Sequence, residues 1–148
     1  MRWITLALLL VQAAPPAPAQ QATPVPSPRV FASEFGLVLN FVKADKIADF
    51  EASIEKLKEA LQASPKPERN QQAATWKVYK ATEPAAAGNV LYVFTIDPPV
   101  KGADYTVSTI FSEAFPDEAQ TLYKQYADSY GAGQNIVNLT LLSDLGKE

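Results

Sequence analysis

The alternation of apolar and polar positions predicts four β-strands, which cover residues 35–43, 74–80, 90–96 and 136–142. Each of these segments is rich in β-branched and aromatic residues, which are typical of strands. A turn-forming stretch at residues 83–89 separates the second strand from the third. We therefore expect these two strands to pair as an antiparallel hairpin.

A helical pattern follows the first strand. Its apolar residues recur at spacings of three and four, which places them on one side of a helix that faces a core: Ile47, Phe50, Ile54, Leu57 and Leu61. Pro65 and Pro67 follow, and the residue before a proline disfavours helical geometry. The helix is therefore expected to end near Ala63.

A second helical region is divided by Pro116 into residues 105–115 and a following helix. We expect the following helix to place Tyr123, Tyr126 and Tyr130 in the core, and Gly131 and Gly133 to end it as C-terminal caps. The resulting β-α-β-β-α-β order predicts an α+β, ferredoxin-like fold. This is a four-stranded antiparallel sheet with helices on one face, here with the second helix split.

Both faces of the predicted sheet are apolar. In the third strand, Tyr92 and Phe94 alternate with Leu91 and Val93. A sheet covered by helices on one face alone normally exposes polar residues on the other face. We therefore expect a homodimer that buries the second face, because closed two-fold dimers are the commonest assembly. The alternative is that a tail or the split helix folds over that face.

The element order, the two-sided strands and the interrupted second helix resemble the dimeric α+β barrel superfamily. This superfamily includes antibiotic-biosynthesis-type monooxygenases and stress-responsive α/β barrel proteins. The resemblance covers about residues 35–142 and implies two sheets packed into a barrel, with a ligand or active site between sheet and helices. It carries over no catalytic residue, because members that do chemistry often use a His and this chain has none.

The composition narrows the chemistry further. The 148-residue chain contains no Cys and no His. Catalysis by a Ser-His or Cys-His nucleophile and stabilisation by disulfide bonds are therefore excluded. Its net charge of −3 does not match the basic surface of a nucleic-acid-binding protein. We expect no catalytic residue, no metal site and no cofactor, and we leave open whether the chain is an enzyme.

The N-terminus predicts export to the periplasm or the medium. Arg2 precedes a stretch at residues 4–11 that is apolar apart from Thr5, and Ala17-Pro18-Ala19 provides a signal-peptidase site. A membrane span needs about 20 apolar residues, so we expect residues 1–19 to be a cleaved signal peptide that leaves no stable anchor. The remaining expected parts are a Pro-rich linker or disordered tail at 20–33, a single domain at 34–143 and a C-terminal tail at 144–148.

A candidate ligand site lies on the sheet. We expect the polar residues to share the face away from the helices, with aromatic residues as walls: Asn40, Asn138 and Thr140, with Trp76, Tyr92 and Phe94. Such a site would bind a small apolar or aromatic molecule. The alternative is that Asn40 and Asn138 bond to each other, across strands or across the dimer, and fix the strand register.

Three functions are consistent with these features. The first is an exported, non-catalytic domain that self-associates through its open sheet face and binds a small molecule. The second is a cofactor-independent, monooxygenase-like enzyme. The third is a structural or partner-binding module of the cell envelope.

Overall fold

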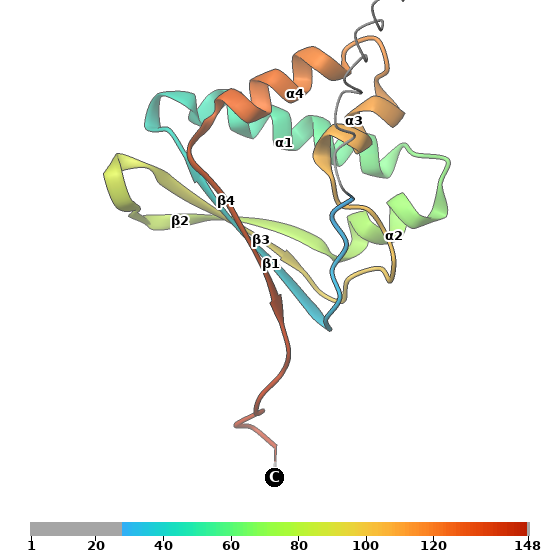
Figure 1. The fold of residues 1–148 in the computed structure, drawn as a ribbon, viewed down its shortest axis with the longest axis vertical. Coiled ribbons are helices and arrows are strands. Elements are labelled where there is room, and N and C mark those ends of the chain that lie inside the picture. The colour runs from blue at the N-terminus through green and yellow to red at the C-terminus, as the bar shows by residue number, and fades with distance from the viewer. Residues whose placement is uncertain (1–27, 148) are drawn as a thin grey trace, which may run out of the picture.

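A computed structural model describes residues 28–147, which form a four-stranded antiparallel sheet with helices on one side (Figure 1). The elements are β1 (Phe35–Val42), α1 (Ile47–Gln62), α2 (Pro67–Thr75), β2 (Trp76–Pro84), β3 (Val90–Ile96), α3 (Val107–Ala114), α4 (Ala119–Asp128) and β4 (Tyr130–Leu139). The strand order is β2-β3-β1-β4. This is the predicted ferredoxin-like layout, with the second helical region split into α3 and α4. The expected signal peptide lies outside the described residues.

The core lies between the sheet and the helices α1, α3 and α4 (Figure 1). Every second residue of β1 and β3 points into it, so burial alternates along both strands. Phe50 of α1 lies at the centre of an aromatic cluster. Its ring centroid is 4.7 Å from that of Tyr92, 5.7 Å from that of Tyr126 and 5.8 Å from that of Tyr130. The alternation of two sets of side chains predicted for β1 and β3 is confirmed.

The segment before β1 belongs to the folded domain, so the expected linker at 20–33 and domain start at residue 34 are wrong for residues 29–33. Phe31 is only 6% exposed. Its ring lies 2.6 Å from the position that a Cβ atom at Gly36 would occupy, so only glycine fits there. The backbone N–H of Tyr105 donates to the Arg29 carbonyl at 2.8 Å and fixes the segment against the loop before α3.

Helix α2 is absent from the sequence prediction. Its buried residues are Arg69 and Gln72, which are polar, so it has no apolar periodicity to detect. Pro67, which we expected only to end α1, occupies the first turn of α2, where a proline needs no N–H partner. As a result β2 begins at Trp76, two positions after its predicted start.

The expected glycine caps are also wrong. Helix α4 ends at Asp128, and both Gly131 and Gly133 lie inside β4, which begins at Tyr130. Gly133 has a φ of 79°, a conformation that favours glycine, and it lies opposite a register shift between Phe41 and Val42 of β1. The irregular start of the strand explains why a simple alternation pattern predicted it only from residue 136.

None of the helices within residues 28–147 is both long enough and apolar enough to cross a membrane.

Candidate functional site

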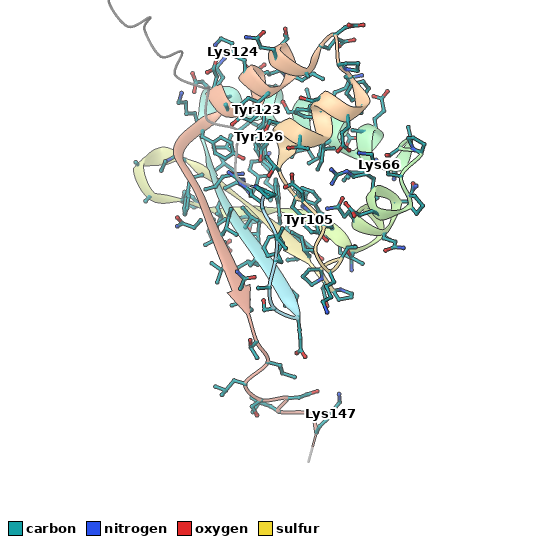
Figure 2. All side chains as sticks on the ribbon, turned by 45° about the vertical axis from the view of Figure 1, so that its right-hand side comes forward. Lys66, Tyr105, Tyr123, Lys124, Tyr126 and Lys147 are labelled. Carbon is teal, nitrogen blue, oxygen red and sulfur yellow. The ribbon has the colours of Figure 1, made fainter. Side chains whose placement is uncertain are left out.

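A cavity of about 300 Å³ lies where α3, α4, β4 and the N-terminal segment meet. Aromatic, hydroxyl and amide side chains dominate its lining, which consists of Arg29, Thr106, Val107, Ser108, Tyr123, Tyr126, Ala127, Tyr130, Gly133 and Gln134. Among these residues only Arg29 carries a charge. Figure 2 shows two of the lining residues, Tyr123 and Tyr126, projecting from α4.

Gln134 organises the polar side of this cavity. Its Nε2 atom lies 2.8 Å from Asn40 Oδ1 and 2.7 Å from the hydroxyls of both Tyr126 and Tyr130. Its Oε1 atom accepts a hydrogen bond from Nη1 of Arg29. The Tyr130 hydroxyl in turn donates to Asn40 Oδ1 at 3.0 Å. The network therefore joins the N-terminal segment to β1, α4 and β4.

Asn40 lies on the helix side of the sheet, so its expected position on the opposite face is wrong. Its side chain is fully buried, and its register partners are Tyr92 on β3 and Gln134 on β4. Its Nδ2 atom donates to the carbonyls of Val38 at 3.2 Å and Tyr92 at 3.1 Å. Both polar atoms of the Asn40 side chain are therefore bonded within the protein. Asn40 does not line the cavity itself, but it positions the lining residues Gln134 and Tyr130.

Asn138 and Thr140 do not join Asn40. Asn138 shares the helix side, where its Oδ1 atom accepts hydrogen bonds from the Ala32 N–H at 3.0 Å and the Ser33 hydroxyl at 3.3 Å. Thr140 lies beyond the end of β4 and is exposed. The register also contradicts the alternative of an Asn40–Asn138 pair, because Asn138 lies opposite Gly36.

The three predicted aromatic residues lie on the helix side too. Phe94 and Tyr92 are buried with Phe50, and the Tyr92 hydroxyl donates to Glu51 at 2.6 Å. Trp76 packs on Phe94, with ring centroids 5.7 Å apart, and lines a separate groove between α1 and β2. They are core residues and do not surround one ligand site with the three polar residues.

Two phenols of the cavity are held in their neutral form. Burial raises the pKa of Tyr126 to about 12. Burial, and then the neighbouring Tyr126, raise the pKa of Tyr130 well above its ordinary value. The charge of Arg29 opposes both shifts without cancelling them. At neutral pH the cavity therefore presents a guanidinium cation and neutral hydroxyls.

A second buried polar cluster has a different organisation. Arg69, 3% exposed, donates to the two carboxylate oxygens of Glu113 through Nε at 2.9 Å and Nη2 at 3.0 Å. Its Nη1 donates to Gln72 Oε1 at 2.7 Å and to the Asp104 carbonyl. The ion pair with Arg69 holds the pKa of Glu113 below its usual range. These bonds fasten α2 to α3 and to the preceding loop, which is a structural role.

Over the part of the chain that the structure describes, no group of three or more His, Cys, Asp or Glu side chains is placed to hold a metal ion.

Of the network around Gln134, only Asn40 is among the predicted site residues. Arg29 lies in a stretch whose prolines suggested a linker, and Gln134 lies ahead of the predicted fourth strand. Tyr126 and Tyr130 were expected to share one helix, whereas the structure places Tyr130 on β4. The available signal was the sequence Val30-Phe31, two apolar residues that follow Pro28 and Arg29.

Comparisons of this chain with protein-family models, with curated proteins and with solved structures find no match. The ferredoxin-like layout alone does not indicate a function, because one fold hosts many unrelated activities. The functional interpretation therefore rests on the cavity and on the sheet face that residues 28–147 leave uncovered.

Proposed function

We propose that this chain is an exported, non-catalytic domain that forms a homodimer through its open sheet face and binds a small molecule between sheet and helices. The open face is the side of the sheet away from the helices. The observation that carries the proposal is its apolar surface, formed by Leu37, Leu39, Phe41, Leu91, Val93, Val137 and Leu139. The N-terminal sequence supports export.

The distribution of charge on the open face favours a second copy as its cover. The residues that β1, β3 and β4 direct to this face are all uncharged, and Lys77 on the β2 edge is the one cation that the paired strand positions direct to it. In a two-fold contact each patch meets its own copy, which an uncharged apolar patch tolerates without like-charge repulsion. Burying such a surface is favourable by about 25 cal/mol per Å².

The residues after β4 expose further apolar side chains. They project beyond the sheet, as the segment that ends at the C-terminus in Figure 1 and at Lys147 in Figure 2 shows. Leu141, Leu142 and Leu145 are 70%, 99% and 97% exposed. Contiguous exposed apolar side chains mark interaction surfaces.

The cavity supports binding more than catalysis. Its lining within residues 28–147 offers no carboxylate, and its two buried phenols stay protonated at neutral pH. A general base must be deprotonated near the working pH, and these groups are not. We therefore retain the non-catalytic function over the monooxygenase-like enzyme.

Sedimentation equilibrium tests the self-association. We expect the purified protein to have the mass of a dimer and the Leu39→Lys variant to have the mass of a monomer, because a lysine on the open face must be desolvated in the interface. Ala48→Lys is the control. It adds the same charge at an exposed position of α1 and should leave the dimer intact.

A monomeric wild-type protein contradicts the homodimer. A Leu39→Lys variant that keeps the dimer mass and the wild-type circular dichroism contradicts the open face as the interface. Recovery of the wild-type chain in a stable complex with a different protein would favour the partner-binding module instead.

A further inference from the structure

We propose that the cavity between α3, α4, β4 and the N-terminal segment binds a small aromatic carboxylic acid, whose carboxylate pairs with Arg29. This inference rests on the small-molecule role proposed above and names the chemical class of the ligand. It does not depend on the dimer.

Charge is the first argument. Arg29 is the one ionised side chain among the described lining residues. Its Nη1 atom donates to Gln134, and within residues 28–147 its Nε and Nη2 atoms have no hydrogen-bond acceptor. A guanidinium group presents paired N–H donors that match the two oxygens of a carboxylate. The cavity therefore favours an anion, and a planar one.

The backbone fixes where this cation lies. The N–H of Arg29 donates to Asp104 Oδ1 at 2.9 Å and to Thr106 Oγ1 at 3.1 Å, and its carbonyl accepts from the Tyr105 N–H. The Asp104 carboxylate also accepts from the Thr106 N–H at 2.8 Å, so it is engaged by backbone donors. An arginine held on both sides of its peptide is a preorganised ligand group.

Aromatic walls are the second argument. The rings of Tyr126 and Tyr130 meet edge to face, with centroids 5.2 Å apart and planes at 89°. Tyr123 extends this surface, 6.5 Å from Tyr126, and is 44% exposed at the solvent side. Val107 and Ala127 complete the apolar lining. Such a surface gains by packing against the face or edge of an aromatic ring.

The volume of the cavity favours a ligand with a single aromatic ring over larger ligands. Cavities that bind small molecules have volumes of about 300–1,000 Å³, and this one, at about 300 Å³, lies at the lower limit. The cation, the neutral hydroxyls and the aromatic walls together fit a benzoate-like molecule.

Isothermal titration calorimetry with benzoate and its neutral isostere benzamide tests the ligand class. We expect the wild-type protein to bind benzoate more tightly than benzamide. Arg29→Gln should weaken benzoate binding by about tenfold to a hundredfold, the loss expected for a charge-assisted hydrogen-bonded pair, and should leave benzamide binding unchanged. Lys124→Gln removes one cation from an exposed position of α4 and should change neither affinity.

Ala127→Trp provides a second variant that fills the cavity, and it should abolish binding of both compounds. Equal affinity for benzoate and benzamide, or benzoate binding that survives Arg29→Gln, overturns the carboxylate assignment while leaving a small-molecule site in place. Failure of the folded wild-type protein to bind either compound overturns the carboxylate assignment as well, and it also removes support for the small-molecule role itself.

Discussion

The two faces of the sheet follow the same alternation of residues but differ in what covers them. On the helix side, Phe94 is 1% exposed, and Val42 and Asn40 are fully buried. On the open face, the neighbouring Leu39 and Val93 remain partly exposed, with no element of residues 28–147 over them. Residues 28–147 leave this apolar face uncovered, which is the basis of the proposal that a second copy covers it. The comparison therefore separates residues that stabilise the fold from residues that the proposed dimer would bury.

The largest contrast should come from truncating adjacent residues of β3. Phe94→Ala removes a fully buried ring and should lower the free energy of unfolding by about 3–5 kcal/mol. Val93→Ala, on the open face, should have a much smaller effect on the monomer and should weaken association instead. Urea unfolding at low protein concentration measures the first effect, and sedimentation measures the second. Equal losses of monomer stability would contradict the distinction between the two faces.

The next largest loss of stability should come from breaking the ion pair between Arg69 of α2 and Glu113 of α3. Glu113→Ala removes the carboxylate bonded to the buried Arg69 and leaves only Glu68, at 4.0 Å, as its counter-charge among the described residues. The change should cost about 3 kcal/mol, the lower end for buried pairs, because the Glu113 side chain is 27% exposed. The depressed pKa of Glu113 gives the wild type a stabilisation that is fully present above the unfolded carboxyl pKa of about 4.3. It is lost as the pH falls through the lower folded pKa.

Urea unfolding across the acid range checks this prediction. The variant should lose less stability than the wild type as the pH falls below about 4.3, because it has no carboxyl group to protonate at this position. An identical acid dependence in both proteins would mean that the pair contributes no pH-dependent stability.

The same Asn→Leu substitution can be made on each face of the sheet, at Asn40 on the helix side and at Asn135 on the open face. Asn40→Leu removes the partner of Gln134 and Tyr130 within the core and should cost about 1–3 kcal/mol. Asn135→Leu, opposite Leu39 on the open face, should leave the monomer nearly unchanged and tighten the dimer. Chemical unfolding and sedimentation of both variants distinguish these outcomes. A neutral Asn40→Leu would show that the buried network does not stabilise the fold.

The last prediction, with the smallest expected effect, concerns the loss of stability at alkaline pH that the buried Tyr126 phenol causes. Because the pKa of Tyr126 is raised to about 12, the folded state retains a proton that the unfolded state loses near pH 10. The stability that this proton confers is complete below pH about 10 and is lost as the pH rises through about 12. Ultraviolet absorbance of tyrosinate should show one late-titrating phenol fewer in Tyr126→Phe than in the wild type, where Tyr130 also titrates late. A variant with an unchanged titration would contradict the burial of this hydroxyl.

The fold could be predicted because its core strands and α1 bury apolar side chains at regular intervals, as Phe50, Tyr92 and Phe94 do. Helix α2 escaped prediction because its buried face is formed by Arg69 and Gln72, whose partners lie far along the chain. The candidate site could not be predicted from the sequence for a similar reason. Contacts of Gln134 with Arg29 and Asn40 span about a hundred residues and leave no local pattern.

Native mass spectrometry of the purified wild-type protein tests the homodimer most directly, because it counts copies without perturbing the open face. The account predicts a dimer as the main species at concentrations where Leu39→Lys is a monomer with wild-type circular dichroism. A wild-type protein that stays monomeric under the same conditions would contradict the claim that a second copy covers the open face.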